Sequence, residues 1–122
     1  MTKRANNVDT FKTARGDDPI LLFLEELNET GRAAHATRII RTVDALRDQG
    51  FHLPDDKLRK VRGELWELRV TAGRNPYRIL LYHSREGTFV LLHIFHKKDD
   101  AIPKSDIVKA EKRIADDRRR RT

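Results

Sequence analysis

Apolar positions in the first half of the chain recur at the spacing of α-helices. Asp17 and Asp18 before Pro19 supply a carboxylate cap and a proline for a first turn, so a helix is predicted from there to about Thr30 and Gly31. Its apolar positions are Ile20, Phe23, Leu24 and Leu27. A second helix is predicted to end at Gly50. Its apolar stripe is Ala36, Ile39, Ile40, Val43 and Leu46.

After Pro54 the pattern changes from helical to alternating. Three segments rich in aromatic and branched residues, 65–72, 77–84 and 88–95, are predicted strands. The short connections between them favour an antiparallel meander. Pro103 and Ser105 then open a third helix. One face of this helix carries Ile107, Ala110, Glu111 and Ile114.

The elements together predict an α+β fold. Two N-terminal helices pack on a curved antiparallel sheet of three to four strands, followed by a C-terminal helix. Residues 1–16 lack periodicity and are predicted to form a flexible arm. Residues 17–117 form one domain, and residues 118–122 are a basic tail.

The charge and composition of the chain limit the classes of ligand that it can bind and the kinds of site that it can form. The chain has 26 Lys and Arg against 19 Asp and Glu, a net charge of +7, which attracts polyanions such as RNA or DNA. It has no cysteine, so neither a disulfide nor a thiolate metal site can form. No apolar run is long enough to span a membrane and no export signal is present, so we expect a cytoplasmic protein without membrane contact.

The predicted strands have one apolar and one polar side. The apolar side contains Trp66, Leu68, Val70, Ile79 and Leu81. If helices cover that side, Arg69, Arg78 and Tyr82 share the opposite face. In the third strand His93 is in phase with Phe89 and Leu91, in a series that Phe95 ends.

These residue types suit RNA cleavage without a metal ion. Such cleavage needs a base for the 2′-hydroxyl, cations around the phosphate and a proton donor for the leaving oxygen. Arg69 and Arg78 are candidates for phosphate stabilisation, and His93 and Lys97 are candidates for proton transfer. Tyr82, on the same face as the arginines, is a further candidate catalytic residue. Candidate RNA-binding cations are Lys57, Arg59, Lys60, Arg62 and Lys98.

Structural alternatives exist for each of these residues. Glu67 can pair with Arg69 or Arg78 and merely solvate the sheet. His93 can be a core histidine, and the ring of Tyr82 can simply pack. The cations of 57–62 can protect an edge strand, and those of 118–121 can be a solvated end.

We predict neither a metal nor another cofactor. His83, His93 and His96 are clustered, but no carboxylate stands at a ligand spacing beside them. The sequence also lacks a glycine-rich phosphate loop and a recognisable Ser-His-Asp arrangement.

Three stretches of the chain resemble one protein family. They are Gly63–Arg69 (GELWELR), Tyr77–Leu80 (YRIL) and Val90–Lys98 (VLLHIFHKK), followed by Pro103, Ile107, Ala110 and Arg113 in the last helix. This series is similar to the RelE/HigB-like toxins, particularly their phage-derived branch, over about residues 18–117. Two departures are Ile94, where the branch often has glycine, and Asp99-Asp100 after the lysine pair.

The resemblance implies a toxin of a bacterial type II toxin-antitoxin system that cleaves messenger RNA in the ribosome. It implies silencing by a helix-turn-helix antitoxin. The family-like residues fall on Arg69, Arg78, His93, Lys97 and Lys98. Two other functions compete: inhibition of DNA gyrase, as in ParE-like toxins of the same fold, and RNA binding without catalysis.

Overall fold

The computed structural model describes residues 6–121, which form three α-helices, a 3-10 turn and five strands. The helices are α1 (Pro19–Glu29), α2 (Ala33–Gln49) and α3 (Lys104–Arg121), and the turn is η1 (Gly50–His52). The strands are β1 (Asn7–Thr10), β2 (Leu58–Arg62), β3 (Leu65–Ala72), β4 (Asn75–His83) and β5 (Thr88–His96). No helix within this part of the chain is long and apolar enough to cross a membrane.

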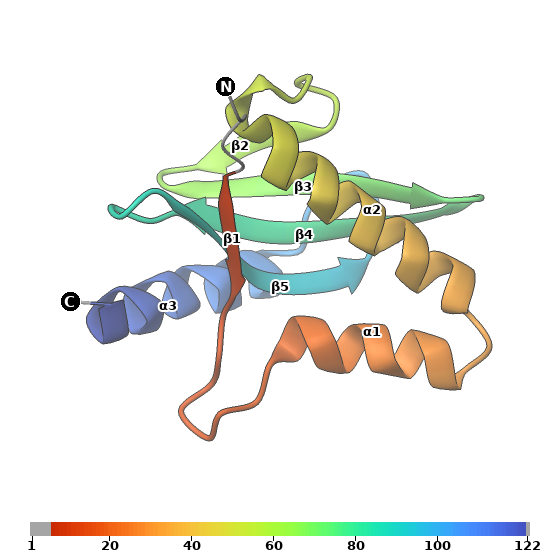
Figure 1. Cartoon of the computed structure of the whole chain (residues 1–122), viewed down its shortest axis with the longest axis horizontal. Coiled ribbons are helices and arrows are strands. Elements are labelled where there is room, and N and C mark those ends of the chain that lie inside the picture. The colour runs from red at the N-terminus through yellow and green to blue at the C-terminus, as the bar shows by residue number, and fades with distance from the viewer. Residues whose placement is uncertain (1–5, 122) are drawn as a thin grey trace, which may run out of the picture.

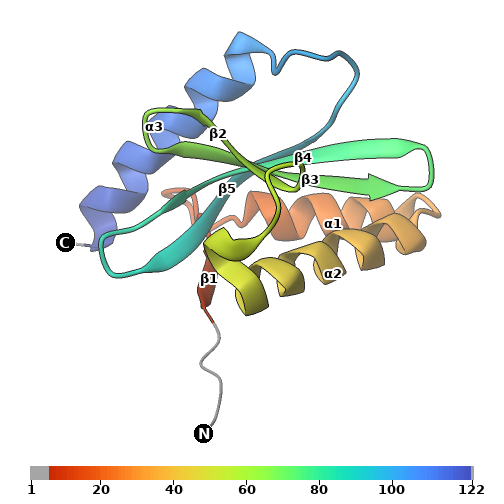
Figure 2. The same cartoon turned by 90° about the horizontal axis from the view of Figure 1, so that it is seen from above.

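The sheet is open and mixed, with the strand order β1-β5-β4-β3-β2. Strands β2 to β5 form the predicted antiparallel meander, and β1 joins its edge in parallel with β5. Helices α1 and α2 cover one face of the sheet and α3 crosses the other, as Figures 1 and 2 show. The predicted α+β fold is confirmed, with a five-stranded sheet in place of three to four strands.

The helix ends are set by local chemistry. The side chain of Asp18 accepts a hydrogen bond from the backbone N–H of Leu21 (3.0 Å), so it caps α1 as predicted. Gly50 follows α2 with a φ of 54°, which disfavours other residues. Its N–H donates to the carbonyl of Leu46. Both predicted helix boundaries are therefore confirmed.

Two apolar cores lie on the two sides of the sheet. The first, under α1 and α2, includes Ile39, Leu46, Leu68, Ile79 and Leu81. The second, under α3, includes Leu65, Leu80, Tyr82, Leu92 and Ala110. Because both faces are covered, successive residues of β4 are all buried from Tyr77 to Tyr82. The prediction that helices cover the Leu68 side is confirmed.

The flexible arm predicted for residues 1–16 is wrong from Asn7 to Phe11. Asn7–Thr10 pair with Thr88–Leu91 as β1, and Phe11 is buried in the second core with 2% of its surface exposed. A four-residue strand with a single apolar side chain carries little periodicity, so it cannot be predicted from the pattern of the sequence. Residues 1–5 lie outside the described part of the chain.

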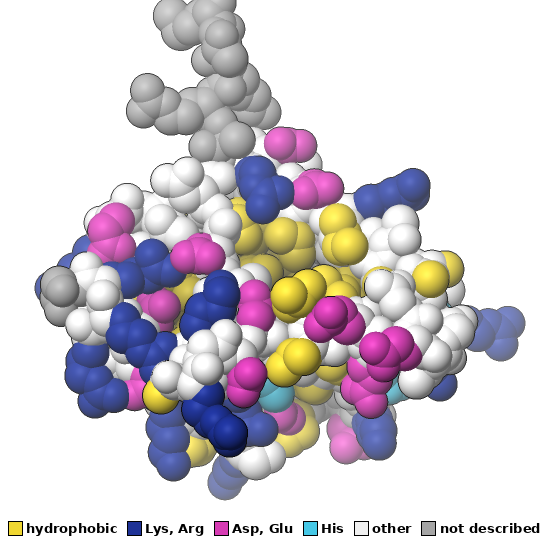
Figure 3. Space-filling view, turned by 60° about the horizontal axis from the view of Figure 1, so that its bottom comes forward, with side chains coloured by type: hydrophobic (Ala, Val, Ile, Leu, Met, Phe, Trp, Pro, Cys, Tyr) yellow, Lys and Arg dark blue, Asp and Glu magenta, His cyan; other side chains and the backbone are white. Residues whose placement is uncertain are grey.

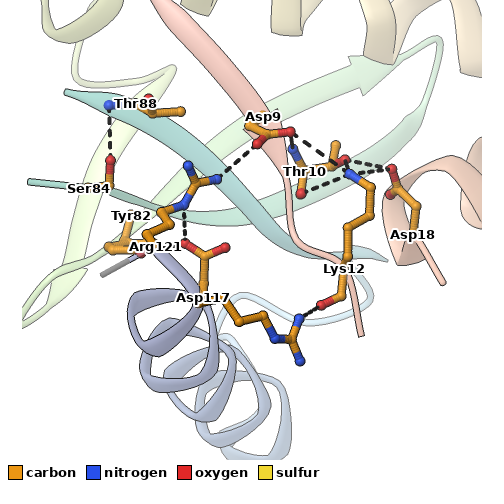
Figure 4. Close-up of polar contacts among 10 residues, drawn as sticks. Asp9, Thr10, Lys12, Asp18, Tyr82, Ser84, Thr88, Asp117 and Arg121 are labelled. Carbon is orange, nitrogen blue, oxygen red and sulfur yellow. Dashed lines mark hydrogen bonds and ion pairs between the residues drawn. The ribbon is translucent and has the colours of Figure 1, made fainter. Parts of the chain in front are cut away.

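The predicted basic tail is also wrong, because α3 continues through Arg121. Arg121 donates to Asp117 (2.6 Å) and to Asp9 of β1 (2.9 Å), as Figure 4 shows. The hydroxyl of Tyr82 donates to the same Asp117 carboxylate (2.6 Å). These contacts attach the last turn of α3 to β1 and β4. Thr122 lies outside the described residues.

A β-bulge in β5 changes the phase of its side chains. The register passes from Leu80 opposite His93 to Leu81 opposite Leu91, which leaves Leu92 without a partner in the ladder. The carbonyl of Leu92 instead accepts from Arg113 of α3 (2.8 Å). His93 therefore lies on the α3 side, whereas Leu91 faces the first core. The predicted common phase of His93 with Phe89 and Leu91 is wrong.

Some apolar side chains remain at the surface. Leu21 and Leu22 of α1 and Ile40 of α2 are about half exposed, although Ile40 belongs to the predicted apolar stripe. On the face shown in Figure 3, apolar side chains gather near the centre beside acidic ones, and Lys and Arg gather at the left. Charge is thus unevenly distributed over this surface.

Phe11 supplies a direct test of the ordered N-terminal segment. Phe11→Ala is expected to lower the free energy of unfolding by about 3–5 kcal/mol, the usual cost of removing a buried aromatic ring. Chemical denaturation followed by circular dichroism measures this change. Lys12→Ala, an exposed neighbour, is the control. A loss below about 1 kcal/mol in Phe11→Ala would show that the segment does not belong to the core.

Candidate functional site

The two candidate arginines lie side by side on the face of the sheet that α3 partly covers. Arg69 of β3 is directly opposite Arg78 of β4 in the antiparallel register. Glu67, two residues before Arg69, lies on the same face. Its two carboxylate oxygens contact Nε of Arg69 (3.1 Å) and Nε of Arg78 (3.4 Å). One carboxylate therefore holds two guanidinium groups together.

Burial distinguishes the two arginines. The side chains of Glu67 and Arg78 are each only 8% exposed, whereas the side chain of Arg69 is 31% exposed. Burial lowers the pKa of Arg78, and the Glu67 carboxylate opposes that shift. Since an arginine keeps its charge in proteins, the three residues carry a net charge of +1. The Glu67 ion pair considered from the sequence exists, but it is buried and does not merely solvate the sheet.

His93 forms a pair with a carboxylate of α3. Its Nε2 lies 2.6 Å from Oδ1 of Asp106. Burial lowers the pKa of His93 below its ordinary value of 6.5, although Asp106 acts in the opposite direction. The imidazole is therefore neutral at pH 7. With its proton on Nε2 and donated to Asp106, Nδ1 keeps a lone pair that can accept a proton.

Phe95 connects His93 to the arginines. Its ring stacks on that of His93 with centroids 5.6 Å apart, and it is the direct cross-strand partner of Arg78. His93 and Arg78 are consequently diagonal neighbours, a relation that typically places Cα atoms roughly 7–8 Å apart. Long side chains reach across such a distance. The structure thus brings Arg69, Arg78 and His93 together on one face of the sheet.

Tyr82 does not belong to this group. It lies on the same face of β4 as Arg78, but four residues along the strand, a separation of roughly 13 Å. Only 1% of its surface is exposed, and its hydroxyl donates to Asp117. Burial and the neighbouring Asp117 carboxylate raise the pKa of Tyr82 well above its usual range. The ring packs under α3, so a structural role fits it better than proton transfer.

Lys97 and Lys98 follow β5 at the edge of the group. The backbone N–H of Lys97 donates to the carbonyl of Pro76 (2.8 Å), which continues the β4–β5 pairing next to Tyr77 and His96. Lys97 is partly exposed and Lys98 is exposed. Lys97 is therefore two residues beyond Phe95, directly after the strand that carries His93.

The cations of residues 57–62 are divided between different surroundings. Arg59 is exposed and lies opposite Glu67 in the β2–β3 register, so it borders the group. The backbone carbonyl of exposed Lys57 accepts from the N–H of Arg69 (2.8 Å). Lys60 instead lies over the ring of Trp66 at 5.2 Å, and Arg62 makes two hydrogen bonds to Glu111 (3.0 and 2.7 Å). Lys57 and Arg59 remain the better candidates for contact with an anionic ligand.

Asp106 was absent from the sequence prediction. It lies in the first turn of α3, where an acidic residue is ordinary because it favours the helix dipole. Only the crossing of α3 over β5 brings it to His93. Glu67 had been considered as an ion-pair partner, but its simultaneous contact with both arginines depends on the strand register.

No group of three or more His, Cys, Asp or Glu among residues 6–121 is placed to hold a metal ion. His93 and His96, clustered in the sequence, contact different rings: His93 stacks on Phe95 and His96 packs against Tyr77. The chemistry available at this site is that of its arginines, the His93–Asp106 pair and the neighbouring lysine.

The family model described as "Phage derived protein Gp49-like (DUF891)" matches residues 23–115. This range includes every residue of the group described above. No curated protein sequence matches the chain.

Proposed function

The chain belongs to the Gp49-like family of phage-derived proteins, which is related to the RelE/HigB toxin superfamily, and from this we propose that it is the toxin of a type II toxin-antitoxin system. In this proposal it is an endoribonuclease that cleaves messenger RNA on the ribosome without a metal ion. It works in the cytoplasm and is silenced by a helix-turn-helix antitoxin. The observation that carries the proposal is the grouping of Arg69, Arg78 and His93 on one face of the sheet.

His93 is the proposed general base. Its neutral ring accepts the proton of the ribose 2′-hydroxyl at Nδ1, while Nε2–H remains bonded to Asp106. The 2′-oxygen then attacks the adjacent phosphorus, and the bond from phosphorus to the 5′-oxygen of the next nucleotide breaks. The products are a 2′,3′-cyclic phosphate end and a 5′-hydroxyl end. Asp106 stabilises the imidazolium that forms, as a positioning residue.

Arg69 and Arg78 stabilise the negative charge that develops on the phosphate oxygens. A guanidinium group donates in a planar fork that fits two such oxygens. Glu67 holds both groups in place before the substrate binds, so little reorganisation is needed during the reaction. The more exposed Arg69 makes the first contact, and Arg78 lies deeper.

Lys97 is the proposed proton donor to the leaving 5′-oxygen. It directly follows β5, the strand that carries His93, and lies two residues beyond Phe95, the cross-strand partner of Arg78. The reaction is then balanced in protons, because His93 removes one proton from the 2′-oxygen and Lys97 donates one to the 5′-oxygen. The sequence left open whether His93 or a lysine is the base, and the His93–Asp106 contact favours His93.

The chemical test uses purified protein and 5′-labelled messenger RNA, with and without ribosomes. The proposal predicts ribosome-dependent fragments that end in a 2′,3′-cyclic phosphate, at unchanged rate in the presence of a metal chelator that leaves ribosomes intact. Intact RNA under translating conditions would contradict it. Inhibition of DNA gyrase by the same preparation would instead assign the protein to the gyrase-inhibiting class.

Arg59 provides an electrostatic prediction. Arg59→Ala is expected to weaken RNA binding and to reduce the slope of log affinity against log salt by about 0.7, the value for one phosphate contact with a single strand. Fluorescence anisotropy over a range of salt concentrations measures it. Lys60→Ala is the matched control, because Lys60 lies over Trp66 on the other side of β2. Equal slopes in the two variants would remove Arg59 from the RNA contact.

A further inference from the structure

A basic cavity lies outside the group of Arg78 and His93. It is bounded by α2, by the segment from Leu53 to Lys57 and by β3, and it has a volume of about 370 Å³. We propose that this cavity binds one nucleotide of a single-stranded RNA, with the phosphate on its cations and the base on its apolar wall. The choice of RNA as ligand rests on the proposed function.

The charged part of the cavity wall is entirely positive. Arg38, Arg41, Lys57 and Arg69 line the cavity, and no Asp or Glu does. Among residues 6–121 neither Arg41 nor Lys57 has a carboxylate within ion-pair distance, so both charges are available to a ligand. A concave surface that is lined by cations and by no carboxylate raises the local concentration of anions.

Arg38 is held in place by the sheet. Its Nε donates to the carbonyl of Thr71 at 3.2 Å. The contact fixes Nε and leaves the two terminal nitrogens of the guanidinium group for a ligand. Arg41 follows three residues later on the same face of α2. The two arginines therefore line the α2 side of the cavity together.

The rest of the wall is largely apolar. Its apolar members are Ala45, Leu53, Pro54 and Leu68. The cavity volume falls within the range of small-ligand sites, roughly 300–1,000 Å³. An inorganic anion would leave most of that space and the apolar wall unused. A nucleotide fills both, because it combines a phosphate with a flat base that has apolar faces.

Arg69 connects the cavity to the candidate site. It lines the cavity and also contacts Glu67, which in turn holds Arg78. A strand of RNA with one nucleotide in the cavity would thus present a neighbouring phosphate to the arginine pair. The cavity deepens the proposed function by supplying a specificity site for a nucleotide beside the one that is cut.

Binding is tested separately from cleavage with a fluorescent oligoribonucleotide that carries 2′-O-methyl groups, because these remove the attacking hydroxyl. Arg41→Ala is expected to weaken its binding about tenfold, the loss typical of a charged hydrogen bond. Arg38→Ala should act in the same direction. Arg47→Ala is the matched control on the same helix, since Arg47 is paired with Asp44 (2.8 Å) outside the cavity. Thr42→Phe narrows the cavity without changing the charge and should also weaken binding.

Competition by adenosine 5′-monophosphate and by inorganic phosphate identifies what the cavity holds. Stronger competition by the nucleotide in wild type, lost in Thr42→Phe, supports a nucleotide site. Equal competition by both compounds, or equal affinity of the Arg41→Ala and Arg47→Ala variants, would overturn the inference. Cleavage of unmodified messenger RNA on ribosomes is measured in parallel. Wild type that binds through the cavity but does not cut supports the cavity and contradicts only the proposed function.

Discussion

Arg78→Lys is expected to lower the rate of RNA cleavage by about 100- to 1,000-fold, the usual effect of removing a positioned donor from a developing negative charge. Lysine keeps a positive charge next to the buried Glu67 but cannot offer the planar fork that fits two phosphate oxygens. Single-turnover cleavage of a labelled message in the presence of ribosomes measures the effect.

Lysine is the better substitution because Arg78 is buried. Arg78→Ala leaves the Glu67 carboxylate with Arg69 alone in a site of low exposure, and breaking a buried ion pair in this way commonly costs about 3–5 kcal/mol. Loss of activity in the alanine variant would therefore combine a chemical and a structural effect. Arg74→Lys, in the exposed β3–β4 turn, is the control. Full activity of a folded Arg78→Lys variant would exclude Arg78 from phosphate stabilisation.

His93→Gln is expected to lower cleavage by about 100- to 10,000-fold, the contribution of a general base. Glutamine keeps a hydrogen-bond donor for Asp106 but does not accept a proton. Measurement of the rate against pH gives a sharper test than the rate at one pH. In wild type the rate should rise with pH as His93 loses its proton, and burial places the midpoint below 6.5.

Asp106→Asn separates positioning from proton transfer. Asp106 opposes the effect of burial on His93, so its removal should lower the pKa of His93 further and move the rising limb to lower pH. The maximal rate should fall as well, because an amide no longer selects the tautomer with the proton on Nε2. Identical pH profiles in wild type and Asp106→Asn, with His93→Gln fully active, would remove the His93–Asp106 pair from the mechanism.

The lowered pKa of His93 also makes stability depend on pH. The unfolded chain binds a proton at His93 near pH 6.5, whereas the folded protein binds it only at lower pH. The free energy of unfolding should therefore fall as pH decreases from about 6.5 through the folded pKa. Denaturation at several pH values should show a smaller fall in His93→Gln than in wild type.

Local signals made the helices and the meander predictable. The Asp18 cap, Pro19 and Gly50 fix the ends of α1 and α2 through contacts within a few residues. Alternation along β3 and β4 placed Arg69 and Arg78 on one face, and the register confirmed it. These features depend on neighbours in the sequence or on one short turn.

The predictions that proved wrong all depend on contacts between segments that are distant in sequence. β1 exists because it pairs with β5, and the last turn of α3 is held by Asp9 of β1. The bulge at Leu92 depends on the fit of β5 to β4 and α3 and has no periodicity of its own. Tyr82 was grouped with the arginines because it shares their face, but α3 covers it. The helix that crosses a face of the sheet determines which part of that face remains accessible to a ligand.

The central claim is tested most directly in a bacterial host that lacks the antitoxin. The chain and its Arg78→Lys variant are induced in parallel, and new 5′ ends are mapped on translated and untranslated transcripts. The account predicts cuts confined to translated messages and absent from the variant. Growth arrest with intact transcripts would contradict it.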